Sequence, residues 1–120
     1  MTTKPLAASD SRRSTRVLVD LEVDYGLEDN YLFAYITNIS ATGIFVRTTT
    51  PEEPGTHLNL RFSPGPDDYL ELEGEVIWVN PYRPGTPDNL HPGMGIRFVD
   101  LDDEQRDRLI DLVRRFAYLT

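Results

Sequence analysis

The chain has 120 residues and no cysteine, and its 20 acidic and 12 basic residues give a net charge of -8. This length is typical of a single domain with one hydrophobic core. The lack of cysteine excludes a disulfide framework and any thiolate ligand or nucleophile. The acidic balance argues against binding of DNA or RNA without sequence preference, because such binding needs many lysines and arginines to replace condensed counterions.

The sequence contains no run of about 18 apolar residues, so it predicts no membrane insertion. Residues 1–11 are polar, without apolar periodicity and without the apolar core of a signal peptide. We therefore expect a flexible N-terminal segment over residues 1–11, one domain over residues 12–120, and a cytoplasmic location.

The first two predicted strands form a hairpin. Residues 17–25 alternate between apolar and mostly acidic side chains, which is the period of a half-buried strand. Residues 31–37 are rich in aromatic and β-branched side chains, and turn-favouring residues fill the interval 26–30.

The hairpin register decides which side chains meet at its open end. If Tyr25 faces Tyr31 across the turn, Arg16 faces Ser40, with Cβ atoms roughly 5 Å apart. A register slip of two residues still leaves Arg16 beside a polar residue such as Asn38. A slip of one residue would turn Arg16 onto the opposite face.

Further strand patterns follow, separated by turns rich in proline, glycine and aspartate. They predict strands at residues 43–49, 57–62, 69–79 and 93–99. In the segment 69–79 we expect Trp78 to lie in the core and Gly74 to mark a bulge or a barrel bend. Residues 80–92 hold four prolines and predict an exposed loop.

The end of the chain has the period of a helix. Asp102, Asp103 and Glu104 supply a cap and first-turn acids, and an apolar stripe extends from Leu109 to Ala117. Six strands followed by one helix predict a mainly β protein, a six-stranded antiparallel β-barrel over about residues 17–99 with a C-terminal α-helix over about residues 102–118. The pattern leaves a β-sandwich open as the alternative.

A basic cluster precedes the first strand of this acidic chain. Residues 4–16 carry four cations and one acid, a local charge of +3, namely Lys4, Arg12, Arg13 and Arg16 against Asp10. Guanidinium groups make paired hydrogen bonds to phosphate and stack on aromatic bases. The cluster therefore favours a ligand that combines phosphate with purine.

The hairpin brings this cluster to the segment Asn38-Ile39-Ser40-Ala41-Thr42-Gly43. Asn38 and Ser40 are two residues apart, so on a strand they would offer short polar side chains on one face. Gly43 permits a turn or a close backbone approach. Together the two segments predict an anion site.

These two segments resemble the motifs of the PilZ domain, a small β-barrel that binds the bacterial second messenger cyclic di-GMP. The family pattern is Arg-xxx-Arg followed by Asp/Asn-x-Ser-x-x-Gly, which matches Arg12 to Arg16 and Asn38 to Gly43. The resemblance extends to the strand with Trp78 and to the run Gly93-Met94-Gly95-Ile96-Arg97-Phe98, so it spans nearly the whole chain. In overall style the sequence is similar to the PilZ domains of myxobacteria.

The resemblance implies roles for the arginines. Arg12 and Arg16 would hold the phosphates and stack on guanine, with Arg13 assisting. The family often binds the ligand as an intercalated dimer, and the residue before the first motif arginine influences the stoichiometry. Here that residue is Ser11, which does not decide whether one or two ligand molecules bind.

The resemblance also assigns barrel residues. Asn38 and Ser40 would contact guanine from the barrel surface, and Gly43 would shape the turn. Arg97 points away from the core face of the last predicted strand, which makes it a candidate for a further phosphate or base contact.

We expect a receptor domain without enzymatic activity, in which cyclic di-GMP orders the arginine segment and changes the surface offered to an effector protein. The alternative is a PilZ-like interaction module that does not bind nucleotide. We expect no metal, no cofactor apart from the ligand and no catalytic residue. His57 and His91 lack a metal-ligand spacing, and Ser40 lacks the sequence of a nucleophile elbow.

Overall fold

A computed structural model describes residues 16–82 and 92–119 of the chain. The expected flexible segment 1–11 and most of the expected loop 80–92 lie outside these residues. The described elements, in chain order, are strands β1 (Val17–Leu27), β2 (Asn30–Ile39), β3 (Gly43–Arg47), β4 (His57–Gly65), β5 (Asp68–Asn80) and β6 (Gly93–Val99), and helix α2 (Asp103–Leu119).

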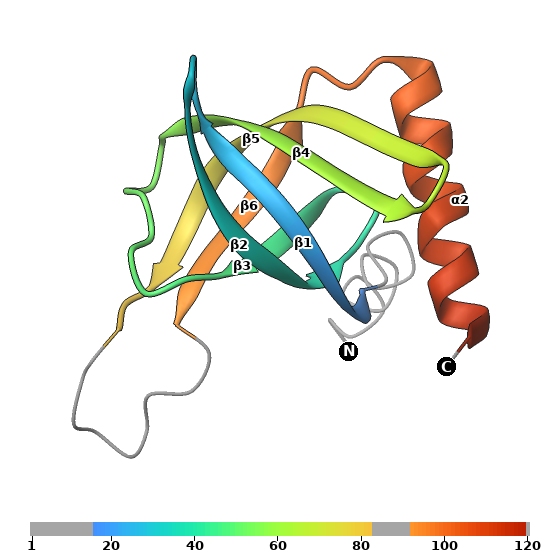
Figure 1. Cartoon of the computed structure of the whole chain (residues 1–120), viewed down its shortest axis with the longest axis horizontal. Helices are drawn as coiled ribbons and strands as arrows, with labels where there is room; N and C mark the ends of the chain where they lie inside the picture. The colour runs from blue at the N-terminus through green and yellow to red at the C-terminus, as the bar shows by residue number, and fades with distance from the viewer. Residues whose placement is uncertain (1–15, 83–91, 120) are drawn as a thin grey trace, which may run out of the picture.

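The six strands form a closed barrel in the order β1, β2, β3, β6, β5, β4 (Figure 1). All neighbouring strands are antiparallel, and β1 closes the barrel by pairing with β4. The predicted six-stranded antiparallel barrel is therefore confirmed. Because the sheet closes on itself, the β-sandwich left open by the sequence pattern is excluded.

The barrel interior is filled by the inward-facing side chains of every strand. Full burial of a large aliphatic side chain stabilises the fold by about 1.5–3 kcal/mol. The largest fully buried side chains are Val23, Tyr25, Ile36, Ile39, Ile44, Val46, Leu60, Val76, Met94, Ile96, Leu109 and Leu112.

Gly74 faces this interior rather than marking a bulge. It pairs in regular register with Leu58 on β4 and with Phe98 on β6. A Cβ at Gly74 would collide with the Ile96 side chain. The glycine thus makes room for a core isoleucine, and the bulge of β5 lies further along, between Val76 and Trp78.

The β1–β2 hairpin differs from its expected register at the turn and agrees with it at the open end. Tyr25 lies opposite Leu32 rather than Tyr31, a shift of one residue. A bulge between Leu18 and Leu21 inserts one extra residue into β1. Val17 consequently lies opposite Ile39, as the expected pairing of Arg16 with Ser40 requires.

Helix α2 stands against one side of the barrel (Figure 1). Asp102 and Gln105 cap its first turn reciprocally, since each backbone N–H donates to the other side chain, at 2.7 and 2.9 Å. Leu109 and Leu112 join the barrel core. The helix predicted over about residues 102–118 is thus confirmed as a cover of the core.

Arginines of α2 also bind the β4–β5 turn. Arg108 and Arg115 donate to the two carboxylate oxygens of Asp68, at 3.4 and 3.1 Å. Both pairs are partly exposed, so each contributes little to stability. They connect α2 to the start of β5.

Candidate functional site

Three β-bulges shape one region of the outer barrel surface. They lie between Leu18 and Leu21 in β1, between Ile36 and Asn38 in β2, and at Val76–Trp78 in β5. A bulge reverses the side-chain alternation beyond it and redirects side chains. Here the bulges align one outward row across five strands, formed by Leu18, Asn38, Phe45, Gly95 and Trp78.

Trp78 lies on this outer row, so its predicted core position is wrong. The bulge after Val76 turns the indole outward, where it remains 49% exposed. Its ring stacks on Phe45 with a centroid distance of 5.4 Å and an interplanar angle of 29°. The prediction assumed that every second residue of the strand faces the core. The extra residue of the bulge breaks this alternation before Trp78.

Gly95 provides the flat surface beneath the indole. A Cβ at this position would collide with Nε1 of Trp78, and a Cβ at Gly93 would meet the Phe45 ring at 2.8 Å. The two glycines of the Gly93-Met94-Gly95 run therefore let both aromatic rings lie close to the backbone of β6. The result is an aromatic platform, made of Phe45 and Trp78.

Arg16 reaches the same row from the start of β1. Its Nη1 donates a hydrogen bond of 2.7 Å to Oδ1 of Asn38. Partial burial lowers the pKa of the Arg16 guanidinium from its ordinary value, because desolvation disfavours the charged form. The group still keeps its proton at neutral pH, so it presents a partly desolvated cation beside the platform.

Ser40 is placed differently from the expectation that it shares an exposed strand face with Asn38. It follows the last residue of β2 and is fully buried. Its Oγ accepts hydrogen bonds of 3.2 Å from the backbone N–H groups of Thr42 and Gly43. The hydroxyl thus fixes the β2–β3 turn, which positions the end of β2 that carries Asn38.

Replacing Ser40 with alanine is expected to destabilise the domain by about 1–3 kcal/mol, because two turn N–H groups lose their acceptor in a buried site. Urea denaturation monitored by circular dichroism measures the loss. Thr42→Ala is the matched control, since the exposed Thr42 hydroxyl contacts Ser40 Oγ but accepts no backbone N–H among the described residues. A Ser40→Ala variant as stable as the wild type would contradict this role.

Gly43 opens β3 at a point of close backbone approach. A Cβ there would collide with the backbone carbonyl oxygen of Ile96 on β6. This agrees with the expectation of a close approach at Gly43. Gly43 also lies opposite Arg97 of β6.

Arg97 is exposed on the outer surface of β6, two residues from Gly95, and lies outside the pocket that contains the platform. Its Nη2 donates a hydrogen bond of 2.8 Å to Oε1 of Glu75 on β5. A ligand contact by Arg97 would have to compete with this ion pair. Its role as a contact stays a prediction.

The Arg16–Asn38 pair and the platform line one pocket of about 760 Å³. This volume lies in the range typical of small-molecule sites. The pocket is lined by Arg16, Leu18, Val19, Asp20, Thr37, Asn38, Ile44, Phe45, Arg47, Trp78, Asn80 and Gly95. Arg12 and Arg13, the other predicted arginines of the site, lie outside the described residues.

Of the twelve lining residues, sequence reasoning placed only Arg16 and Asn38 in the site. The aromatic and charged side chains that it missed are Phe45, Trp78, Asp20 and Arg47. A usable signal was present in the glycine spacing of Gly93-Met94-Gly95, because glycines on the outward face of a strand indicate close approach by another group. Asp20 and Arg47 had no such signal. They line one pocket because their strands, β1 and β3, lie on either side of β2.

Over residues 16–82 and 92–119, no cluster of three or more histidine, aspartate or glutamate side chains is placed to hold a metal ion. No helix in this part of the chain is long and apolar enough to cross a membrane.

The fold and sequence match known proteins. A family model described as PilZ domain matches residues 10–115. The PilZ domain of YcgR from Escherichia coli, solved with c-di-GMP, has a TM-score of 0.72 and 14% identity, and the match covers 90% of this chain and 92% of that chain. The PilZ domain of CeSA from a cellulose-synthesizing bacterium has a TM-score of 0.65 and 15% identity, with coverages of 87% and 99%.

A further similar structure is the inhibitor of motility MotI/DgrA from Bacillus subtilis, with a TM-score of 0.72 and 18% identity over 91% of this chain. The match covers 52% of MotI/DgrA, so this chain spans about half the length of that protein. A search of curated proteins finds no match. At these identities the structural likeness shows a shared fold, while the family model covers most of the sequence; the chain belongs to the PilZ domain family.

Proposed function

We propose that this domain is a receptor for cyclic di-GMP, which binds in the pocket between the Arg16–Asn38 pair and the aromatic platform. One observation carries the proposal: Arg16, Asn38, Phe45 and Trp78, which come from four separate strand regions, meet in one pocket. The motif arginines and the structural likeness to a PilZ domain solved with c-di-GMP support the same ligand.

The chemistry of the pocket suits both parts of such a ligand. A guanidinium group donates in parallel to two phosphate oxygens and favours anions. An exposed indole offers a flat surface on which a purine base can stack. The pocket thus combines a cation with an aromatic surface, whereas the chain as a whole is acidic.

The expected contacts contribute a large part of the free energy of micromolar binding. Charge-assisted hydrogen bonds contribute about 1.5–3 kcal/mol each, and stacking of one base on an aromatic ring contributes about 1–3 kcal/mol. Micromolar affinity corresponds to a net free energy of about 8 kcal/mol. The phosphate contacts of Arg12, Arg13 and Arg16 and the stacked base must together exceed this value by the cost of association.

The proposed response is an ordering of the arginine segment against the barrel. Phosphate contacts by Arg12 and Arg13 would hold the segment before β1 beside Asn38 only in the bound state. The surface near the start of β1 would then differ between the free and bound protein, and an effector protein that recognises one form would respond to the ligand.

Isothermal titration calorimetry with cyclic di-GMP tests the receptor proposal. We expect saturable binding in the micromolar range. An absence of heat and saturation at tens of micromolar ligand would contradict it.

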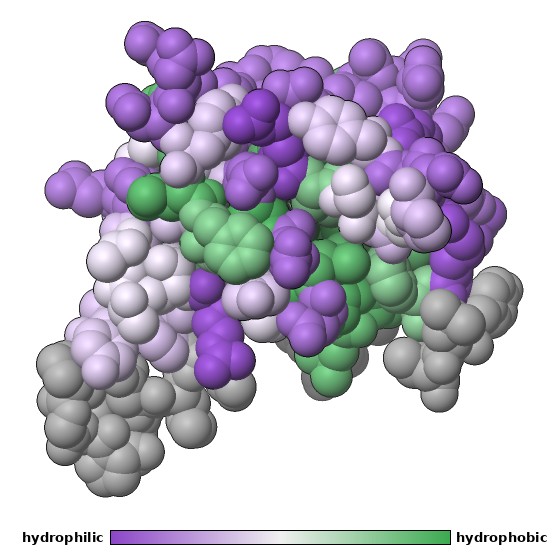
Figure 2. Space-filling view, viewed as in Figure 1, coloured by the Kyte–Doolittle hydropathy of each residue, from purple (hydrophilic) through white to green (hydrophobic). Residues whose placement is uncertain are grey.

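A second function, an interaction module that does not bind nucleotide, is favoured by exposed aromatic side chains of β2 that are not among the lining residues of the Arg16–Asn38 pocket. Phe33 and Tyr35 of β2 are 55% and 42% exposed and form an edge-to-face pair with a centroid distance of 5.2 Å. Figure 2 shows hydrophobic surface between hydrophilic side chains on the face where β1 and β2 lie in front. This module would bind its partner equally with and without cyclic di-GMP.

Replacing Trp78 with alanine is expected to weaken cyclic di-GMP binding about tenfold, because the stacking surface is lost. Calorimetric titration measures the change in dissociation constant. Tyr69→Ala is a matched control, since Tyr69 is similarly exposed on β5 but lies outside the pocket. Unchanged affinity of Trp78→Ala would remove the platform from the site.

A further inference from the structure

The proposed binding pocket continues along the barrel surface. A second pocket of about 720 Å³ adjoins it and shares three lining residues, Asp20, Thr37 and Arg47. The second pocket is otherwise lined by Tyr35, Thr48, Thr49, Tyr82 and Pro92. The shared residues therefore lie between two parts of one continuous groove.

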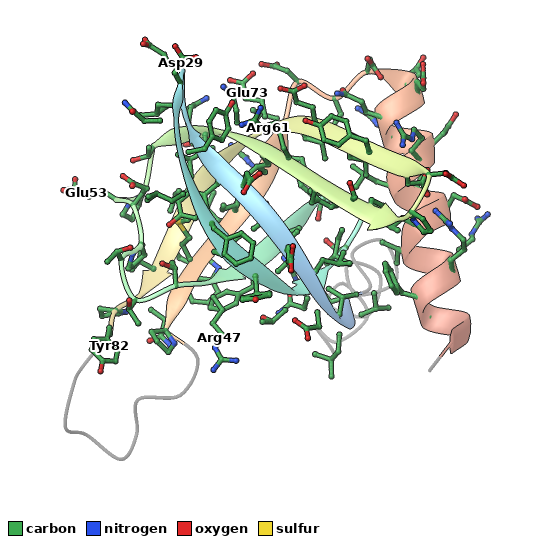
Figure 3. All side chains as sticks on the ribbon, in the orientation of Figure 1. Asp29, Arg47, Glu53, Arg61, Glu73 and Tyr82 are labelled. Carbon is green, nitrogen blue, oxygen red and sulfur yellow. The ribbon has the colours of Figure 1, made fainter. Side chains whose placement is uncertain are left out.

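Asp20 and Arg47 are opposite charges that do not pair with each other. Neither side chain forms an ion pair or a hydrogen bond within residues 16–82 and 92–119. Asp20 lies on β1 and Arg47 on β3, on either side of β2, so two strand spacings, roughly 10 Å in all, separate the strands that carry them. Figure 3 shows the Arg47 side chain projecting away from the barrel.

Asp20 is a notable residue for an anion site. A carboxylate repels the phosphates of a ligand. It favours binding only if the ligand also offers hydrogen-bond donors, because an ionised carboxylate accepts hydrogen bonds and donates none. The groove thus needs a ligand with phosphates for Arg16 and donor groups for Asp20.

Guanine has the complementary edge. Its Watson–Crick edge presents the O6 acceptor followed by the N1–H and 2-amino donors. A carboxylate accepts from both donors, and a guanidinium donates to O6. Adenine presents an amino donor and the N1 acceptor at the corresponding positions, so it would meet Asp20 and Arg47 with the wrong groups.

We propose that Asp20 and Arg47 read the Watson–Crick edge of one guanine, which lies across β2 above Thr37. Asp20 accepts from N1–H and from the 2-amino group, and Arg47 donates to O6. The pair makes the domain specific for guanine among cyclic dinucleotides. This inference rests on the proposed function and names the residues that would select the base.

The sign of the mutational effect separates base reading from general electrostatics. Replacing Asp20 with alanine removes a negative charge near an anionic ligand, so long-range electrostatics alone predicts tighter binding. Loss of a two-point hydrogen bond to guanine predicts weaker binding, by about tenfold. Because Asp20 is exposed, the substitution leaves the barrel core intact.

The experiment titrates wild type, Asp20→Ala and Glu22→Ala with cyclic di-GMP and with cyclic di-IMP, whose bases lack the 2-amino group. Glu22 is the matched control, since it is an exposed acid on β1 that lines neither part of the groove. We expect wild type and Glu22→Ala to prefer cyclic di-GMP about tenfold, and Asp20→Ala to bind both ligands with similar, weaker affinity. For Arg47→Ala, we expect the ratio of the affinity for cyclic di-GMP to the affinity for cyclic di-AMP to be smaller than for the wild type.

Two results would overturn the inference while the receptor proposal stands: wild type binding cyclic di-GMP and cyclic di-IMP equally, or Asp20→Ala keeping the wild-type preference. If wild type binds no cyclic di-GMP, the receptor proposal itself fails, and the assignment of Asp20 and Arg47 fails with it.

Discussion

Replacing Arg16 with alanine is expected to weaken cyclic di-GMP binding by about 100-fold or more. The variant loses the guanidinium that hydrogen bonds Asn38 and lines the pocket. Two charge-assisted hydrogen bonds to phosphate contribute about 1.5–3 kcal/mol each, and each 1.4 kcal/mol corresponds to a tenfold change in affinity. Calorimetric titration measures this change directly.

Two further variants show whether the effect comes from guanidinium geometry. Arg16→Lys keeps the charge but loses the planar fork, so its affinity should lie between those of the wild type and Arg16→Ala. Arg114→Ala removes an exposed arginine from α2, outside the pocket, and should bind as the wild type does. Equal affinity of Arg16→Ala and Arg114→Ala would contradict the proposed site.

Replacing Gly43 with alanine is expected to destabilise the barrel by about 1–3 kcal/mol, the typical cost of overpacking. The new Cβ would collide with the backbone carbonyl oxygen of Ile96. No side-chain rotation can relieve this collision, because the oxygen belongs to the backbone. β3 would have to move away from β6, with which it pairs directly at this point. For a domain of this size, we expect the melting temperature to fall by roughly 10 °C.

Gly65→Ala is the matched control for Gly43→Ala. A Cβ at Gly65 would meet only a side-chain oxygen of Asp68, at 3.9 Å, which is an ordinary contact. Thermal unfolding of both variants by circular dichroism gives the comparison. If Gly43→Ala has the same melting temperature as Gly65→Ala and the wild type, the paired strands β3 and β6 tolerate a side chain at this position, and the prediction is wrong.

The sequence was sufficient to predict the fold because the signals were local and repeated. Alternating hydrophobicity, or richness in aromatic and β-branched residues between turn residues, located the six strands, and the helical period located α2. The cap at Asp102 also followed from local sequence, as the reciprocal hydrogen bonds with Gln105 confirm. These features depend on residues close together in the sequence, so the sequence pattern predicts them.

The site could be predicted only in part because its geometry depends on bulges. The bulge in β1 restored the expected register at Val17 after the turn had shifted it by one residue. The bulge in β5 sent Trp78 to the outer surface, against the alternation of the preceding residues. An inserted residue of this kind leaves no periodic signal, since its effect is to break the period.

Ser40 shows how a motif residue can act through structure. Its place in the Asn-x-Ser-x-x-Gly motif suggested contact with the base, whereas the structure buries its hydroxyl in the β2–β3 turn. A strand pattern assumes that residues two apart share a face, and β2 ends at Ile39, before Ser40. The motif thus combines a residue at the pocket, Asn38, with residues that shape the backbone behind it.

Tryptophan fluorescence tests the central claim most directly, because Trp78 is the only tryptophan in the chain and lies in the proposed pocket. Titration of the purified protein with cyclic di-GMP should change the emission in a saturable manner with a micromolar midpoint, as guanine covers the exposed indole. The change should be absent in Arg16→Ala over the same ligand range. Emission that stays constant in the wild type up to tens of micromolar cyclic di-GMP would contradict binding at this site.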